Sequence, residues 1–565
     1  MQKPEKTIVA VHGIGNQTAF DTVQAVVKQF CKHYGQPATV SLGRLDSEIR
    51  STRNALVLSP PLDPQLPLNV AFTEVYWADI ARGVENKGYQ LEDTRNWART
   101  VIERLKLHQE NNKLFTLKDY ELIKLVLQEI INAISVSEVL MTVFKHVGAY
   151  KPKLENVLTN YLGDVQLMTE FRVVRELILA EFDKAMTALY NYNPATEIYI
   201  LAHSEGTVIS FLGLLRALRQ DSGAVPQPSW IDTVKGFVTL GSPIDKHLVL
   251  WPELRTEFES SGGTWKETLI RWHNYSDLGD PVGFKLDTAR DWLQKIGCGC
   301  FDFPEQNDFS FTRSYLPGKA HVDYMTDTQL FGHIINTVID PQPDQPDPKS
   351  NIFAKILNYI LPYAAAFVPL LVGTYLLYQA VDKYMCYTEP NLSIVLNSLL
   401  IALLLSGTTA LSRVVRLSRR WLAQLFALVF YLATTCLVIQ FVSLETRANI
   451  GKALSALLGY ENTNMAIFAA SVLIAACGLL SRRYSLKPLL FGGFFVVMWV
   501  VGYIVFGDKL VLSSSSVVTM AIAFFCLWWL SAILFDLSFI WHMYIRNNRA
   551  VDKLHEVYIS ELSHL

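Results

Sequence analysis

Apolar residues follow two patterns along the chain, and the change falls near residue 340. Before it, short runs rich in β-branched residues alternate with segments whose apolar positions recur every three or four residues. The runs typical of buried strands are "KTIVAVHG", "FTEVYWADI", "EIYILAH", "VKGFVTLGS" and "TLIRWHNYS". Strands that alternate with helices indicate a mostly parallel sheet, so residues 1–339 are predicted to form an α/β domain.

One block of helical pattern, about residues 95–190, interrupts this alternation. Because it lies between the early and the late strands, it is predicted to be a helical cap inserted into the α/β domain. Its segment 119–148 carries an apolar stripe. The stripe fits a buried cap helix or a lid that contacts lipid.

The second half of the chain has the hydrophobicity of a membrane protein. It begins after the proline-rich segment "DPQPDQPDPKS", residues 340–350, which predicts an extended linker. At about 3.1 Å per residue, such a linker spans at most roughly 34 Å. Six apolar runs then reach the length of a membrane span, namely 352–381, 392–411, 421–443, 464–481, 486–507 and 516–545. They predict an all-α transmembrane bundle over residues 351–546.

Lysine and arginine in the connecting loops predict the orientation of this bundle. The positively charged loops contain Arg413, Arg416, Arg419, Arg420, Arg482, Arg483, Lys487, Arg546 and Arg549. All of them fall on one side of an even number of spans. The α/β domain, the tail at 547–565 and both termini are therefore predicted to face the cytosol. Asp536 is the main charge within the runs, which favours an anchor over a transporter.

Composition excludes some classes of function. The formal net charge of −2 leaves no electrostatic footprint for nucleic acid. The first residues, "MQKPEKTIVAVHG", lack the apolar core of a signal peptide. The seven cysteines are scattered, and the lone pair Cys298 and Cys300 favours a loop over a metal site. We therefore expect neither a metal nor an organic cofactor.

The stretch "EIYILAHSEGTVISF" contains a candidate nucleophile. A strand ends at Ser204 and a helix begins at once, which is the context of a nucleophile elbow. The pattern is G-x-S-x-G with Ala202 in the place of the first glycine and with Gly206 retained. The motif alone leaves open that Ser204 is an ordinary serine between two elements.

A second stretch, "VAVHGIGNQ", offers the donors that acyl transfer needs. Backbone N–H groups must point at the developing oxyanion. In this arrangement they come from the residue after the nucleophile, Glu205, and from the loop after an early strand, Ile14. Gly13 and Gly15 flank Ile14. A nucleotide-binding turn looks similar, but neither a P-loop lysine nor the G-x-G-x-x-G spacing is present.

Candidates for the acid and the base follow later in the chain. "WHNYSDLGDPVGF" offers Asp277 and Asp280 after a strand, and "GKAHVDYMTD" offers His321. The histidine would take the proton of the serine, and the carboxylate would orient the imidazole. The chain order serine, acid, histidine is that of α/β-hydrolases. The pattern alone leaves both aspartates open.

These motifs together resemble a serine hydrolase of the α/β-hydrolase fold, within its lipase and phospholipase-like branches. "VHGIG", "AHSEGT" and "VTLGSPID" are similar to the oxyanion loop, the elbow and the following strand and turn. "GDPVGFKLD" and "HVDYMTD" are similar to the acid and histidine segments of DDHD-type phospholipases. The resemblance covers about residues 5–335 and implies that Asp280 is the acid. It departs at Ala202, and the six apolar runs match no pattern of the family.

The expected function is therefore that of a membrane-anchored lipase or phospholipase. Its substrate would be an ester of the lipid bilayer, cleaved through an acyl-enzyme on Ser204. An esterase or thioesterase on an acylated protein or small molecule is the next alternative. Two others stay open at this point, a non-catalytic hydrolase-like binding or assembly module on the membrane bundle and a toxin-like lipase effector.

Overall fold

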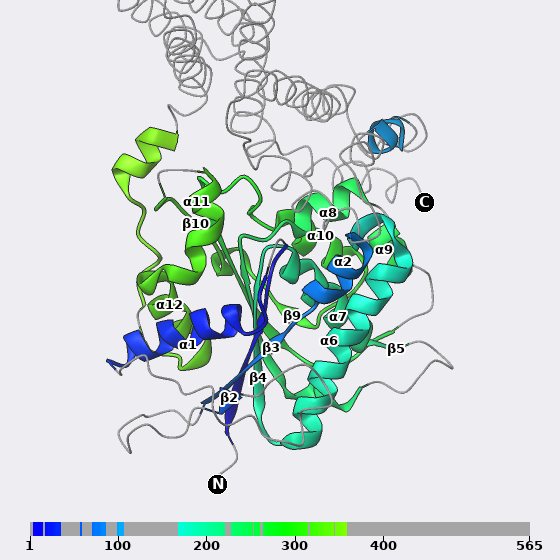
Figure 1. Ribbon diagram of the computed structural model, residues 1–565, viewed down its shortest axis with the longest axis horizontal. Coiled ribbons are helices and arrows are strands. Elements are labelled where there is room, and N and C mark those ends of the chain that lie inside the picture. Colours follow the sequence, from blue (N-terminus) through cyan, green and yellow to red (C-terminus); the bar gives the residue numbers. More distant parts are fainter. Residues whose placement is uncertain are drawn as a thin grey trace, which may run out of the picture. The chain divides into compact units, whose positions relative to one another are not determined.

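A mostly parallel β-sheet forms the centre of the computed structural model (Figure 1). The structure describes residues 4–14, 17–35, 57–58, 70–85, 99–104, 106, 168–220, 228–251, 253–259, 264–314, 317–343 and 345–358. All belong to one of two compact units, which comprises residues 1–120, 153–358 and 549–565. Most of the predicted cap, the apolar runs beyond residue 358 and the tail lie outside the described residues. Among the residues described, no helix is both long and apolar enough to cross a membrane.

Within the described ranges the main sheet has eight strands in the order β10-β8-β6-β4-β1-β3-β2, with β9 paired to β8. Every pairing is parallel except that of β2 with β3. The strands are β1 (Lys6–Val11), β2 (Val57–Leu58), β3 (Val70–Val75), β4 (Glu197–His203), β6 (Val234–Leu240), β8 (Ile270–Asp277), β9 (Phe301–Asp302) and β10 (Asp308–Phe311). The prediction of an α/β domain with a mostly parallel sheet is confirmed.

Helices cover both faces of the sheet. The elements of one layer are α2 (Ala78–Glu85), α6 (Arg172–Tyr192), α7 (Glu205–Leu218), α8 (Ile244–Leu250), α9 (Glu253–Glu259) and α10 (Asp287–Lys295), with the 3₁₀ turn η2 (Ser229–Thr233). The other layer has α1 (Asp21–His33), α12 (Thr328–Ile334) and the π-helical turn η5 (Ile335–Ile339). In Figure 1, α1 and α12 lie on one side of the strands and α6 and α7 on the other.

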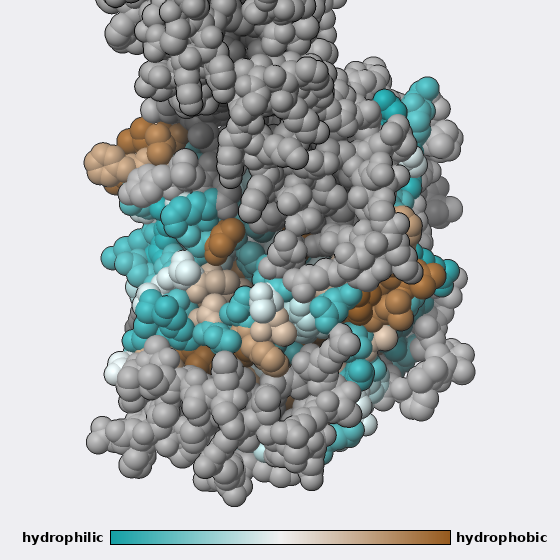
Figure 2. Space-filling model, in the orientation of Figure 1, coloured by the Kyte–Doolittle hydropathy of each residue, from teal (hydrophilic) through white to brown (hydrophobic). Residues whose placement is uncertain are grey.

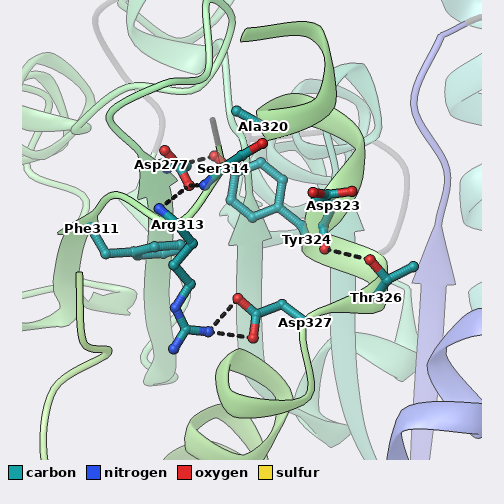
Figure 3. A pocket seen from close by; sticks show the side chains of 9 residues that line it. All are labelled: Asp277, Phe311, Arg313, Ser314, Ala320, Asp323, Tyr324, Thr326 and Asp327. Atoms are coloured by element: carbon teal, nitrogen blue, oxygen red, sulfur yellow. Dashed lines mark hydrogen bonds and ion pairs between the residues drawn. The ribbon is translucent and has the colours of Figure 1, made fainter. Parts of the chain in front are cut away.

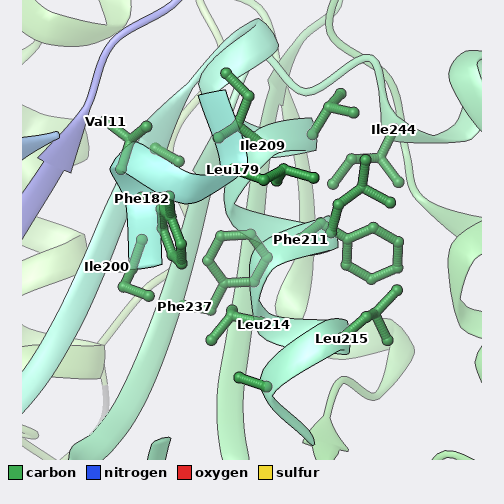
Figure 4. Close-up of a cluster of buried hydrophobic side chains, with 14 of the residues drawn as sticks. Val11, Leu179, Phe182, Ile200, Ile209, Phe211, Leu214, Leu215, Phe237 and Ile244 are labelled. Carbon is green, nitrogen blue, oxygen red and sulfur yellow. The ribbon is translucent and has the colours of Figure 1, made fainter. Parts of the chain in front are cut away.

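The two cores follow from the alternation of side chains along each strand. In β1, Ile8 and Ala10 face the core beneath α1, whereas Val9 and Val11 face the core beneath α7. Figure 4 shows the second core, where Phe182, Phe211 and other apolar side chains gather between helices and sheet. A strand buried on both faces is mostly apolar, which is why β1 and β4 appear in the sequence as nearly continuous apolar runs.

Helix α6 changes one boundary of the predicted cap. Its buried residues Ile178, Phe182 and Met186 belong to the same core cluster as Val11 of β1. The helix therefore packs in the layer that covers the sheet, beside α7. Residues 172–190 are part of the α/β domain proper, because their apolar face is used against its core.

The remaining elements are short and lie at the edges. Strands β5 (Arg219–Gln220) and β7 (Thr264–Trp265) form a separate antiparallel pair. The others are η3 (Glu305–Asn307), α11 (Pro317–Val322) and η4 (Asp323–Thr326). Because β1, β4, β6 and β8 are parallel neighbours, the loops after them meet at one edge of the sheet. The candidate residues Ile14, Ser204 and Asp280 follow β1, β4 and β8, and His321 lies in α11, after the parallel strand β10.

Candidate active site

Ser204 occupies a sharp turn between β4 and α7. Its backbone has φ 53° and ψ −129°, a region that residues other than glycine rarely adopt. The Ser204 N–H donates to the carbonyl of Leu240, and its own carbonyl accepts from Thr207 N–H and from the Thr207 hydroxyl. These three bonds hold the turn against β6 on one side and the first turn of α7 on the other.

Gly206 allows α7 to begin so close to the sheet. A Cβ at this position would lie 2.4 Å from the carbonyl oxygen of His12 and 2.7 Å from that of Val11. Both neighbours are backbone atoms of β1 and its loop, so they cannot rotate away. Gly13 approaches Ser204 in the same manner, since a Cβ there would lie 2.7 Å from Ser204 Cβ. Gly15, the other glycine of this loop, lies outside the described residues.

The structure brings Ser204, His321 and Asp280 into one hydrogen-bonded line. His321 Nε2 lies 2.8 Å from Ser204 Oγ, and His321 Nδ1 lies 3.0 Å from each oxygen of Asp280. With Asp280 ionised, Nδ1–H donates to the carboxylate, which leaves Nε2 as the acceptor for the serine proton. All three side chains are buried. This is the arrangement by which an imidazole can take a proton from a serine hydroxyl.

The surroundings of Asp280 keep its carboxylate ionised. Burial alone raises its pKa, but the facing His321 ring and the N–H groups of Val282 and Gly283 outweigh that effect, and the pKa lies below its ordinary value. The Val282 N–H donates to Oδ1 at 2.7 Å, and the Tyr324 hydroxyl donates to Oδ2 at 2.8 Å. An ionised, fully hydrogen-bonded acid can hold an imidazole in one tautomer.

Asp277, the other candidate acid, has different partners. Its carboxylate accepts from the N–H of Gly279 at 2.7 Å, of Arg313 at 2.9 Å and of Ser314 at 3.2 Å. Its own N–H donates to the Tyr324 hydroxyl at 2.6 Å. The hydrogen bonds of Asp277 thus hold backbone segments together, whereas Asp280 is the aspartate that meets His321.

Gly241, at the end of β6, makes room for this acid and base. Its φ is +57°, and a Cβ there would lie 2.8 Å from Asp280 Oδ2 and 3.3 Å from His321 Nδ1. The same Cβ would also lie 2.8 Å from the Tyr324 ring. Glycine is therefore needed for both the backbone conformation and the space.

His203, next to Ser204, supports the backbone of His321. Its Nε2 lies 2.7 Å from the His321 carbonyl oxygen, and the two ring centroids are 4.8 Å apart. Burial, with His321 close by, lowers the pKa of His203 to about 3, so the ring is neutral at physiological pH. A neutral ring that donates from Nε2 fixes the main chain of His321 without adding a second positive charge beside it.

His12 orients the candidate oxyanion loop. Its Nε2 accepts the N–H of Trp77 at 3.1 Å, so the proton is on Nδ1, which donates to the Gly13 carbonyl at 2.8 Å. The Trp77 indole stacks on the ring and donates to the carbonyl of His12. Because a trans peptide is planar, a Gly13 carbonyl held toward His12 turns the N–H of Ile14 to the opposite side.

Glu205 contributes the other candidate donor. It is the first residue of α7, where a backbone N–H has no acceptor within the helix and the helix dipole is positive. Its buried carboxylate points elsewhere, with Oε1 3.1 Å from His247 Nε2 of α8. Although these two atoms are close, the groups are not oriented to form a hydrogen bond.

Sequence reasoning missed three contributors to this geometry: Tyr324, Gly241 and the ring of His12. Tyr324 follows His321 by three residues, which is one helical turn, and this spacing was the available signal. Gly241 stands in the quoted "VTLGSPID", at the end of a strand. For the ring of His12 the sequence carries no signal, since its partner Trp77 is distant in the chain.

Comparisons of the chain with protein-family models, curated proteins and solved structures found no match. The geometry of the site is therefore what indicates its chemistry. Within the part of the chain described above, no group of three or more His, Cys, Asp or Glu side chains could hold a metal ion. The described side chains can pass a proton from the Ser204 hydroxyl to His321, whose ring is oriented by Asp280.

Proposed function

We propose that this chain is a serine hydrolase of the α/β-hydrolase fold that cleaves carboxylic esters of membrane lipids, as a lipase or phospholipase. The observation that carries the proposal is the hydrogen-bonded line from Ser204 through His321 to Asp280, with 2.8 Å between Ser204 Oγ and His321 Nε2. Its setting adds support, because the serine stands on a strained turn between a central parallel strand and a helix.

The proposed reaction has two steps. Ser204 Oγ attacks the ester carbonyl carbon while its proton passes to His321 Nε2, and the N–H groups of Ile14 and Glu205 stabilise the oxyanion. His321 then gives the proton to the leaving alcohol, and an acyl-enzyme forms. A water molecule, deprotonated by His321, attacks the acyl group, and the free acid leaves as the proton returns to Ser204.

The membrane-lipid substrate rests on the second half of the chain. The six predicted apolar runs lie almost wholly outside the described residues, so the anchor remains a prediction from hydrophobicity. An anchored enzyme meets bilayer lipids at high effective concentration. Ser204 is itself buried, with 2% of its surface exposed, so a lipid has to displace part of the protein to reach it.

The first experiment is labelling of membranes that contain the whole chain with a fluorophosphonate probe, with detergent or lipid present to open the site. We expect labelling of the wild type and none of Ser204→Ala. Ser310→Ala, which removes an exposed serine of β10, is the matched control and should label normally. A folded wild-type protein that does not label would refute the proposed activity and favour a non-catalytic binding module.

Two further variants test the acid and the base. His321→Ala and Asp280→Asn should both abolish or greatly slow labelling. If Asp277→Asn abolished labelling and Asp280→Asn did not, the assignment of the acid would be wrong. Hydrolysis of phospholipid or triacylglycerol vesicles, compared with a soluble short-chain ester, then tests the substrate class. Turnover of the soluble ester alone would favour the esterase alternative.

A further inference from the structure

The chain that leads into the predicted membrane region is hydrogen-bonded to a loop near the candidate site. Residues 349–358, here called the clamp segment, comprise the last two residues of the proline-rich linker and the eight residues after it, of which 352–358 are helical. Ala354 and Asn358 are buried, whereas Ile352, Phe353, Ile356 and Leu357 are exposed. In Figure 2 the brown surface at the upper left corresponds to this helix in Figure 1. The clamp segment thus uses its small and polar face, not its apolar face, against the α/β domain.

The clamp segment binds the three residues that follow β10, Thr312 to Ser314. The Thr312 N–H donates to the Ser350 hydroxyl at 3.1 Å, and the Thr312 carbonyl accepts from the Asn351 N–H at 2.6 Å. The Asn358 amide donates to the carbonyl of Ser314 at 3.0 Å. The carbonyl of Lys349 accepts from Arg313 Nε at 3.1 Å. Four residues of the clamp segment are thereby attached to the 312–314 loop.

The 312–314 loop holds the turn at residues 277–280, which carries both aspartates. The N–H groups of Arg313 and Ser314 both donate to the carboxylate of Asp277, as drawn in Figure 3. These residues and Tyr324 line a cavity of about 180 Å³. Asn358 also lies close to this turn, because a Cβ built at Gly279 would be 2.9 Å from its amide nitrogen. Its Oδ1 is buried and accepts no hydrogen bond from any described residue.

Tyr324 completes the path to the acid. Its hydroxyl accepts from the Asp277 N–H at 2.6 Å and donates to Asp280 Oδ2 at 2.8 Å. A hydroxyl has a single proton, and here the backbone amide of Asp277 fixes its direction toward Asp280. The position of Asp277 therefore determines where this donor meets the acid.

We infer that the clamp segment positions the acid Asp280 through the 312–314 loop, Asp277 and Tyr324. The inference rests on the proposed function, since it assigns these groups to the same reaction. Tyr324 and Asn358 are positioning residues, because neither needs to touch the substrate. The α/β domain is thus expected to turn over fastest when the chain that leads to the predicted membrane region is docked beside its acid.

The test measures kcat and KM of the full-length protein in detergent with p-nitrophenyl butyrate, a soluble ester. Rates are expressed per site titrated with fluorophosphonate, so a misfolded fraction does not enter. Tyr324→Phe should lower kcat roughly tenfold at unchanged KM, because the lost bond is to a charged carboxylate. Asn358→Ala should lower kcat roughly threefold, and Lys355→Ala, on the exposed side of the same helix, should leave it unchanged.

The double variant gives the decisive comparison. If the two residues act in one path, Tyr324→Phe with Asn358→Ala should be no slower than Tyr324→Phe alone. If the fold-losses in kcat of the two single variants multiply in the double variant, or if Asn358→Ala keeps the wild-type kcat, the inferred role of the clamp segment is refuted. A wild type without Ser204-dependent labelling would instead refute the proposed function itself, and the clamp with it.

Discussion

Gly241 offers a way to move the acid by a small and known amount. Replacing it with alanine adds a methyl group 2.8 Å from Asp280 Oδ2 and 2.8 Å from Tyr324 Cε2, both buried. Ordinary contacts begin at 3.4 Å, so these atoms must retreat by about 0.6 Å. They cannot turn into solvent, and Asp280 is hydrogen-bonded to His321. The substitution therefore acts on the geometry of the proposed triad.

Two costs of this substitution can be separated. An alanine at φ +57° carries a left-handed penalty of about 1 kcal/mol. Gly297 has φ +69°, and nothing lies within 4 Å of a Cβ built there, so Gly297→Ala carries this penalty alone. The misplacement of the acid is specific to Gly241. Because a shift of 1 Å at a reacting group can cost about a hundredfold, we expect Gly241→Ala to lower kcat roughly ten- to hundredfold.

The assay compares the two variants with the wild type in turnover per titrated site and in thermal midpoint. Gly297→Ala should lose roughly 2–4 °C in the midpoint for the 1 kcal/mol penalty and keep the wild-type kcat. Gly241→Ala should lose more in both. The reasoning would be refuted by a Gly241→Ala variant that keeps the wild-type kcat and loses no more stability than Gly297→Ala.

Other predictions concern the neighbours of the nucleophile and the anchor. Burial, with His321 nearby, lowers the pKa of His203 from 6.5 to about 3, so the stability it contributes is complete above pH 6.5 and is lost as pH falls toward 3. His203→Gln should flatten acid unfolding between pH 6.5 and 4, and an unchanged slope would contradict this. Gly206→Ala should cost roughly 3 kcal/mol, read as a lower thermal midpoint, whereas Gly299→Ala, in open space, should match the wild type. The full chain should stay in the membrane pellet on alkaline carbonate extraction, because the apolar runs reach spanning length; its release would rule out the predicted anchor.

Strands were predictable where burial on both faces made them apolar throughout. "EIYILAH" corresponds to β4 from its first residue to its last. "FTEVYWADI" was predicted as a strand to residue 80, but β3 ends at Val75. The chain turns there because the Trp77 N–H bonds to the ring of His12, a contact that no local pattern contains. Strand β10, "DFSF", was missed because four residues with polar positions do not stand out from a loop.

The candidate site was predictable in its residue types and only partly in its arrangement. Ser204 stood in a motif between a predicted strand and a predicted helix, and His321 stood in a segment identified by its resemblance to a family's histidine segment, so the sequence alone pointed to both. The choice between Asp277 and Asp280 depended on a turn whose two carboxylates point to different partners, and the residues alone left it open. Tyr324 connects both aspartates through one hydroxyl, a function that neither its burial nor its type reveals.

The backbone conformation of Ser204 also affects the stability of the protein. A residue other than glycine at φ 53° and ψ −129° stores roughly 1–3 kcal/mol of strain. Alanine at this position would remove the hydroxyl and keep the strain, whereas glycine would remove both. The Ser204→Gly chain should then have a higher thermal midpoint than the wild type, as expected if the proposed active site is kept at a cost in stability. In a lineage released from selection for the proposed ester cleavage, glycine is the replacement that thermal robustness would favour here.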